Sequence, residues 1–173
     1  AGDSVIIGSA NSKSNNALQI KTNTPIVGNL TVTNYNDGSA NVNAIKLPAQ
    51  LQAGGTITLI NEETAIIVDN TASINATDVA MNATEITVAG TVNATNDVSL
   101  SSNGSMTING NVTASHDADL TAGSALSVAG NVNATNATTL NAGSITVNGK
   151  VETTNEKTTL TSAEITVNGS VNT

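Results

Sequence analysis

The stretch Leu126-Ser-Val-Ala-Gly-Asn-Val132 decides the fold of this chain, because its frame recurs along the sequence. A fixed period of this length indicates a repeat architecture, which takes priority over any local assignment. A sixth, weaker copy begins at Ile66, with Ala72 at an apolar position and Asn70 where glycine is expected. The change is mild, because a positive φ is expected at this site and Asn is the next best residue for it. The glycines of the five clear copies lie 20, 20, 19 and 20 residues apart, and the other four copies are Ile86-Thr-Val-Ala-Gly-Thr-Val92, Met106-Thr-Ile-Asn-Gly-Asn-Val112, Ile145-Thr-Val-Asn-Gly-Lys-Val151 and Ile165-Thr-Val-Asn-Gly-Ser-Val171.

Each repeat contains three short segments in which apolar and polar residues alternate. In one copy these segments are 126–128, 131–134 and 138–140. A period of two predicts β-strands whose apolar side chains point inward. The residues between the segments are rich in Gly, Asn and Ala, as in 141–144, and predict turns. Three strands and three corners in about 20 residues predict one coil of a parallel β-helix, an all-β solenoid.

Stacked coils place equivalent residues one strand spacing apart, about 4.8 Å, so that like side chains form ladders. Each buried aliphatic residue contributes about 1.5–3 kcal/mol, and stability should grow with the number of coils. Small alanines at 94, 114 and 134 complete the interior. The predicted ladders are Ile86, Met106, Leu126, Ile145 and Ile165; Val88, Ile108, Val128, Val147 and Val167; Val92, Val112, Val132, Val151 and Val171; and Leu100, Leu120, Leu140 and Leu160.

We interpret residues 1–173 as one β-helix domain, with irregular coils over 1–65 and regular repeats over 66–173. The irregular part alternates at 18–20, 30–32 and 57–59 and has a turn signal at 35–38. Proline cannot donate to a strand ladder, so Pro25 and Pro48 are expected at corners or exposed edges. The stretch around Pro48, residues 45–52, is a candidate for a loop or lateral excursion rather than a coil.

The chain stops at Thr173, just after the second strand of a coil and without a polar cap. An open strand edge invites end-to-end pairing with another chain. We therefore expect that further coils follow in a longer parent protein and that self-association is possible.

Composition excludes several classes of function. The 173 residues include five Lys, no Arg, thirteen acids, no Cys and Tyr35 as the single aromatic, with a net charge of −8. Nucleic acid is not an expected partner, because phosphate and base contacts depend on clustered Lys and Arg. The lack of Cys excludes disulfides and thiolate metal sites and suits an exported chain. No apolar run approaches the eighteen or so residues that span a membrane.

Two polar rows accompany the ladders. The first is a row of hydroxyl side chains that is expected to point outward. It is either a set of ordinary exposed strand residues, because β-branched Thr suits such positions, or an ice-binding face. The second lies at a corner and predicts a ladder of side-chain amides in which His116 replaces Asn, so that no metal or catalytic role is expected for His116. The first row is Thr87, Thr107, Ser127, Thr146 and Thr166, and the second is Asn96, His116, Asn136 and Asn155.

The acids come closest to a cluster at Asp97, Asp117 and Asp119. Stacked carboxylates could bind calcium, but calcium needs six to eight oxygens, and solvation of a turn explains these residues equally well. We therefore assign no catalytic, cofactor or metal residues. Nine Asn-x-Ser/Thr sequons are present, only slightly more than the roughly six or seven that composition alone generates, so they indicate no function.

Coils such as 119–132 and 139–149 resemble the right-handed β-helical repeats of bacterial surface exoproteins, namely filamentous-haemagglutinin-type adhesins and the passenger domains of autotransporters. The resemblance covers 66–173. The Asn-Pro-Asn-Leu motifs of the two-partner secretion domain are missing, as are the Phe-containing tetrapeptides and Gly-Gly-Ala motifs of polymorphic membrane proteins. A pentapeptide repeat fits only once, at 118–122.

The resemblance implies a non-enzymatic, right-handed stalk that is exported through the outer membrane and presents binding elements at the bacterial cell surface. Right-handedness is also general among parallel crossovers. The implied partner is a host-cell receptor, a matrix protein or a glycan. The alternatives are a carbohydrate-active β-helix enzyme or a carbohydrate-binding module, whose sites combine carboxylates with Arg or Lys and often calcium, and an ice-binding solenoid.

Overall fold

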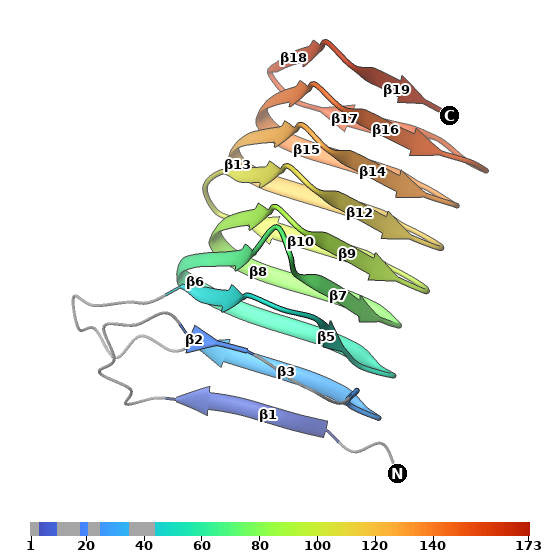
Figure 1. Cartoon of the computed structure of the whole chain (residues 1–173). Coiled ribbons are helices and arrows are strands. Elements are labelled where there is room, and N and C mark those ends of the chain that lie inside the picture. Colours follow the sequence, from blue (N-terminus) through green and yellow to red (C-terminus); the bar gives the residue numbers. More distant parts are fainter. Residues whose placement is uncertain (1–3, 10–17, 21–24, 35–43) are drawn as a thin grey trace.

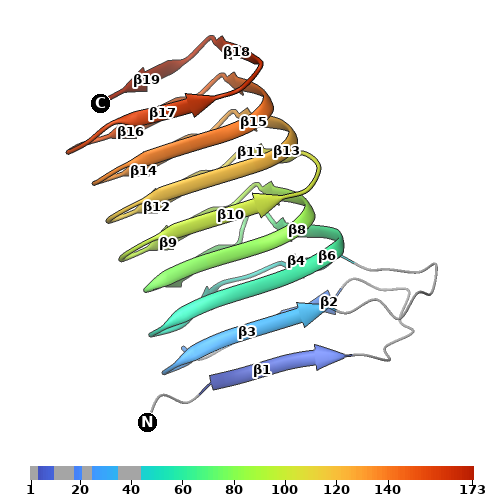
Figure 2. The same cartoon turned by 180° about the vertical axis from the view of Figure 1, so that it is seen from behind.

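The computed structural model describes residues 4–9, 18–20, 25–34 and 44–173, and in these ranges the chain forms strands and no helix. The strands stack coil upon coil from β1 (Ser4–Ser9) at one end to β19 (Ser170–Asn172) at the other (Figures 1 and 2). Every strand pairing is parallel. The predicted fold is confirmed: the chain is a parallel β-solenoid of about six turns.

Within the described ranges the coils are held in two hydrogen-bonded sheets, of twelve and seven strands. The larger sheet contains β1, β2 (Leu18–Gln19), β3 (Asn29–Asn34), β4 (Ile45–Leu47), β6 (Thr56–Val68), β8 (Asp78–Val88), β10 (Val98–Ser102), β11 (Met106–Ile108), β13 (Ala118–Val128), β15 (Thr138–Val147), β17 (Thr158–Thr161) and β18 (Glu164–Val167). The smaller sheet contains β5 (Leu51–Gln52), β7 (Ser73–Ala76), β9 (Thr91–Ala94), β12 (Asn111–Ala114), β14 (Asn131–Ala134), β16 (Lys150–Thr153) and β19.

One of the three predicted corners is absent from several coils. Strands β10 and β11 are separate, as predicted, but in the next coil the equivalent segments form the continuous strand β13. The predicted turn at 141–144 likewise lies inside β15. Between β13 and β15 the register shifts from Ala122 to Ala125. A bulge of this kind bends a strand without ending its pairing, so the chain changes direction here without a turn.

The predicted core ladders are confirmed. In the first ladder Met106 pairs with Ile86 and Leu126, and the other ladders keep the same registers. From Ile86 to Val151 the members of all four ladders are at most 1% exposed. The ladders continue into the irregular coils, where Ile45 pairs with Ile66, and Ile66 with Ile86. On the last coil Ile165 and Val167 are 45% and 46% exposed.

The repeated glycines are needed for close packing between coils, not for an unusual φ. None of them has a φ in the left-handed region. A Cβ atom on Gly130 would collide with the carbonyl oxygen of Gly110 and lie 2.6 Å from that of Asn109. The same contact recurs at each glycine of the column formed by Gly90, Gly110, Gly130, Gly149 and Gly169. The expectation of a positive φ at this position was therefore wrong.

The weak sixth repeat was only partly predicted. Ile66 and Val68 pair with Ile86 and Val88 as expected, but Val92 pairs with Ile74 and not with Ala72. The corner after Val68 is thus two residues longer than in the regular coils, and Asn70 is not the equivalent of a repeat glycine. Ala72 is nevertheless buried, at 3% exposure.

The candidate excursion at 45–52 is part of the solenoid. Strand β4 pairs with β6, and β5 pairs with β7. Ile45, Leu47 and Leu51 are completely buried, because they extend the core ladders. Pro48 follows β4 directly and forms the expected corner, and Pro25 is exposed. The turn signal at 35–38 lies outside the described residues.

A few polar side chains lie inside the core, where alternation predicted only apolar ones. Asn61 is fully buried and donates from Nδ2 to Thr64 Oγ1 and to the carbonyl oxygen of Ala65, both at 2.8 Å. Nearer the C-terminus, Thr153 Oγ1 donates to Thr138 Oγ1 at 2.7 Å. No buried side-chain nitrogen or oxygen in the described ranges lacks a partner, so these groups cost little desolvation energy.

No helix in the described part of the chain is long and apolar enough to cross a membrane.

Candidate functional site

The most concentrated side-chain chemistry lies at the corner between the smaller and the larger sheet. Three of the four predicted corner residues stack as expected, because the backbone N–H of His116 donates to the carbonyl oxygen of Asn96 at 3.0 Å and that of Asn136 to His116 at 2.9 Å. Asn155 leaves the column: its N–H binds the Thr135 carbonyl, and Glu156 binds that of Asn136 instead. The corner after β16 is therefore one residue longer than the corner after β14.

The side chains at this corner do not form the predicted amide ladder. Carboxylates alternate there with hydrogen-bond donors. Asn96 Nδ2 donates to Asp78 Oδ1 at 2.7 Å and to Asp97 Oδ2 at 3.1 Å. Because a donor separates each carboxylate from the next, stacked acids are tolerated without direct repulsion. We call this column, formed by Asp78, Asn96, Asp97, His116, Asp117 and Asn136, the corner column.

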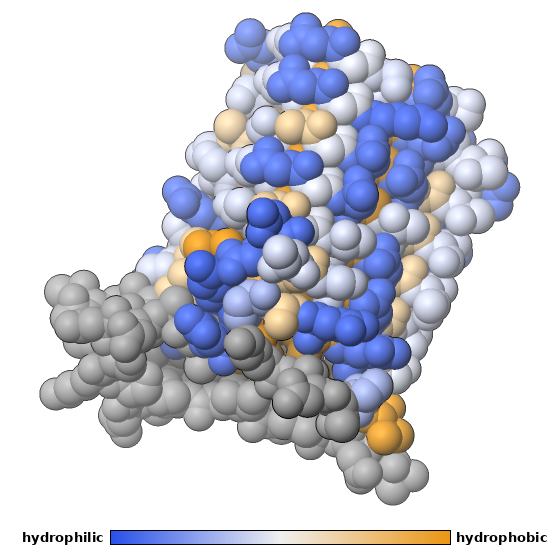
Figure 3. All heavy atoms as spheres, viewed as in Figure 1, coloured by the Kyte–Doolittle hydropathy of each residue, from blue (hydrophilic) through white to orange (hydrophobic). Residues whose placement is uncertain are grey.

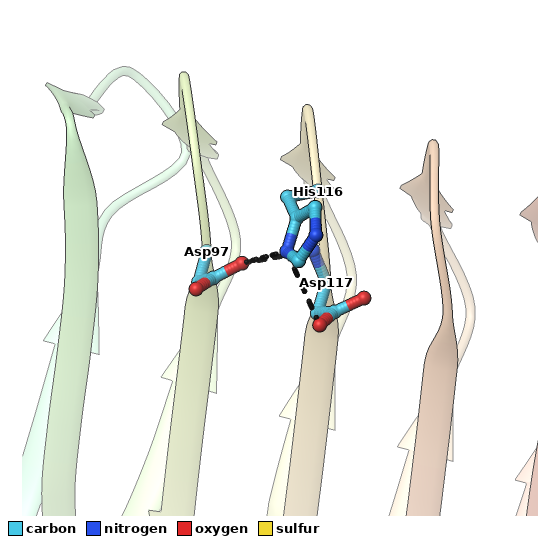
Figure 4. Close-up of side chains that lie close together, drawn as sticks. All are labelled: Asp97, His116 and Asp117. Carbon is cyan, nitrogen blue, oxygen red and sulfur yellow. Dashed lines mark hydrogen bonds and ion pairs between the residues drawn. The ribbon is translucent and has the colours of Figure 1, made fainter.

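His116 lies between two carboxylates of the corner column (Figure 4). Its Nδ1 is 2.9 Å from Oδ1 of Asp97, on the preceding coil, and 3.2 Å from Oδ2 of Asp117. The three side chains are 52%, 44% and 33% exposed for His116, Asp97 and Asp117. Each carboxylate is also held from the next coil: Asp97 Oδ1 accepts the N–H of Asp117, and Asp117 Oδ1 that of Ala137, both at 3.0 Å.

These contacts shift two pKa values in opposite directions. The hydrogen bond to Asp97 raises the pKa of His116. Desolvation opposes this effect, and the charges of Asp117, Asp97 and Glu156 add to it. The hydrogen bond from Asn96 lowers the pKa of Asp78, with help from the backbone of Asp97 and from Thr56 and against desolvation. In both cases the corner favours the charged form.

We expect the stability of the metal-free chain to depend on pH through His116. Unfolded His has a pKa of about 6.5, and the folded pKa is higher, so protonated His116 stabilises the fold fully below about pH 6.5. This stabilisation is lost as the pH rises through the folded pKa. Urea unfolding of wild type and His116→Asn, in chelator from about pH 5 to 9, should show a stability difference that favours wild type most at low pH. A difference that is constant with pH would contradict this expectation.

The structure does not bring all the predicted acids together. Asp119 pairs in register with Ser99 and Thr139 on the exposed side of β13. Among the described residues, the one group of potential metal ligands is Asp97, His116 and Asp117. Asp78, which the sequence analysis did not single out, joins the corner column because it lies 18 residues before Asn96, one fewer than the 19 that separate Asp117 from Asn136. The irregular spacing concealed it.

The predicted outward hydroxyl row is confirmed as a stacked row. Thr107 pairs with Thr87 and Ser127, and Thr146 with Ser127 and Thr166. The residues two positions before each member of this row lie on the same face and are of mixed chemical type. They are Glu85, Ser105, Ala125, Ser144 and Glu164. Figure 3 shows that hydrophilic side chains form columns along the stack.

A surface depression of about 250 Å³ lies over β5, β7 and β9. It is lined by Gln52, Ala53, Gly54, Asn75, Ala76, Thr77 and Thr95. None of these side chains titrates near neutral pH, so the depression offers no acid or base for general acid–base catalysis.

No protein-family model, curated protein or solved structure matches the chain. The proposed relation to bacterial surface exoproteins therefore rests on the sequence resemblance alone. What the structure itself establishes is the architecture: this chain is a parallel β-solenoid with a charged corner column along one edge.

Proposed function

We propose that this chain is a rigid stalk segment of a secreted or surface-displayed bacterial exoprotein of the adhesin class. The observation that supports the proposal is the continuity of the core: four ladders run through successive coils, and their members from Ile86 to Val151 are almost completely buried. Each coil rests on the coil before it and supports the next, so the stack resists bending while it gains length. A spacer requires this combination of stiffness and extension.

The surface suits the same role. Hydrophilic columns follow the stack, and the net charge of −8 favours solubility over non-specific association. Because each coil pairs with its sequence neighbour, the solenoid can fold progressively as a chain emerges from an export pore. The lack of Cys removes the danger of wrong disulfides on that route.

The finer part of the proposal rests on the sequence resemblance to autotransporter passengers and filamentous-haemagglutinin-type adhesins. In this view the parent protein is exported through the outer membrane and remains at the cell surface. The stalk holds a distal or lateral element against a host-cell receptor, a matrix protein or a glycan. That element then binds the partner, and the β-helix holds it away from the cell.

Protease treatment of intact source cells tests the location. We expect an antibody against this segment to detect a polypeptide far longer than 173 residues that protease removes from the cell surface. A lysed sample supplies the control for protease resistance. A short chain that protease reaches only after lysis would overturn the adhesin proposal and leave the fold unaffected.

Deletion of one complete coil tests the spacer role. Removing residues 111–130 joins Gly110 to Asn131, and these residues are equivalent to the natural pair Gly130 and Asn131. We expect this variant to fold cooperatively and to be about 4.8 Å shorter by small-angle scattering. The control deletes residues 111–120, half a coil, and should not fold because its ladders no longer align. Failure of the complete-coil deletion to fold would contradict a modular spacer.

A further inference from the structure

We propose that Asp97, His116 and Asp117 form a binding site for one divalent transition-metal ion, with Zn²⁺ as the expected occupant. Their ligand atoms all lie within 4.8 Å of one another. One imidazole nitrogen and two carboxylate oxygens form a mixed donor set that suits zinc and its neighbours, whereas calcium requires six to eight oxygens. The proposal is independent of the stalk role, because it concerns three side chains on two adjacent coils and not the stack as a whole.

The spacing of the donors fits a single ion. Zinc lies about 2.0–2.2 Å from nitrogen and oxygen ligands, which separates neighbouring ligand atoms by about 2.8–3.6 Å at right to tetrahedral angles. His116 Nδ1 lies 2.9 Å from Asp97 Oδ1 and 3.2 Å from Asp117 Oδ2, within this range. The imidazole nitrogen thus already lies against both oxygens, and a bound ion would occupy the position between the three atoms.

The groups around the three ligands hold the carboxylates in place. Asn96 Nδ2 donates to Asp97 Oδ2 at 3.1 Å, and Asn136 Nδ2 donates to Asp117 Oδ1 at 2.8 Å. These contacts use one oxygen of each carboxylate, so that the other oxygens, Asp97 Oδ1 and Asp117 Oδ2, face His116. Such outer hydrogen bonds fix the orientation of metal ligands and commonly change affinity by about 10–100-fold. The partial exposure of all three ligands leaves room for water to complete the coordination.

His116 distinguishes this coil from its neighbours. The corner positions above and below carry Asn96 and Asn136, whose Nδ2 atoms donate a proton and offer no lone pair to a cation. The repeat therefore supplies a matched control: His116→Asn restores the neighbouring residue and keeps a donor for Asp97. The metal-binding chemistry is removed while the fold is preserved.

Binding of the metal ion is coupled to loss of the proton from Nδ1 of His116. Coordination requires a lone pair on Nδ1, so that protonated His116 loses one proton to buffer when the ion binds, and neutral His116 shifts its proton to Nε2. Affinity for the ion should accordingly rise with pH, because fewer protons then compete for Nδ1.

Isothermal titration of the 173-residue chain with ZnCl₂ tests the proposal. We expect one site in wild type and in Asp119→Asn, whose carboxylate is outside the ligand group, and at least tenfold weaker binding in His116→Asn, Asp97→Asn and Asp117→Asn. Co²⁺ should give a visible absorption band in wild type and none in His116→Asn. Circular dichroism checks that each variant is folded.

Two results would overturn the metal site. Equal affinity for Zn²⁺ in wild type and His116→Asn would mean that scattered surface carboxylates bind the ion. Absence of binding at about millimolar Zn²⁺ would mean that His116 serves as a hydrogen-bond donor like the asparagines it replaces. Neither result affects the stalk proposal, which the coil deletion tests separately.

Discussion

Val128→Asp is expected to destabilise the chain by roughly 3–5 kcal/mol, because it places an unpaired carboxylate in a dry core. Val128 is 0% exposed and lies in register with Ile108 on one side and Val147 on the other. No cation is among these neighbours, so the Asp must either remain protonated or open the coil. Urea unfolding followed by far-UV circular dichroism measures the loss.

The matched control is Ser127→Asp, one residue earlier on β13. Ser127 points outward in the hydroxyl row, beside Thr107 and Thr146, and is partly exposed. A surface substitution of this kind usually changes stability by no more than about 0.5 kcal/mol. If the two variants were equally stable, the assignment of inward and outward faces on β13 would be wrong.

Position in the stack increases the effect of Val128→Asp. A solenoid coil contacts only its two neighbours, so that disruption of a middle coil separates the coils on either side. The same change at Val167 should cost much less, because that residue is already 46% exposed on the last coil. The ratio of the two losses therefore measures how strongly the coils depend on one another.

Gly130→Ala has the second largest expected effect, a loss of about 1–3 kcal/mol. The added Cβ would meet the carbonyl oxygens of Gly110 and Asn109, which are backbone atoms and can move only if the coils separate. Without this contact the same change would stabilise the fold by about 0.4–1 kcal/mol, since φ at Gly130 is not left-handed and alanine restricts the unfolded chain. The sign of the change thus identifies its cause.

Gly104→Ala is the control for this prediction. Its Cβ would lie 2.9 Å from the carbonyl oxygen of Thr84, a looser contact than at Gly130. We expect a smaller loss of stability, measured as the shift in urea midpoint. Equal losses at Gly104 and Gly130 would show that glycine is needed at both sites for a reason other than the distance between coils.

The repeat and the alternation of apolar residues were enough to predict the apolar ladders of the core and the alignment of the coils. Met106, Leu126 and Ile145 occur 20 and 19 residues apart, and each begins an alternating segment, so only one stacking register buries all of them. A slip by one residue would turn every apolar side chain to solvent. This penalty is so large that the ladders could be predicted without coordinates. The period carries no information about a partner, and the stalk proposal depends on resemblance.

The contacts between corners could be identified only in the folded chain. Asp78 meets Asn96 across 18 residues, and Asn155 leaves the corner column, because corners differ in length while strands keep their register. The joining of two segments into β13 and the crowding at Gly130 likewise depend on how closely one coil approaches the next. Side-chain alternation constrains which face a residue occupies. The distance between neighbouring backbones follows from the packed stack, and for this reason the cluster of Asp97, His116 and Asp117 became visible only in three dimensions.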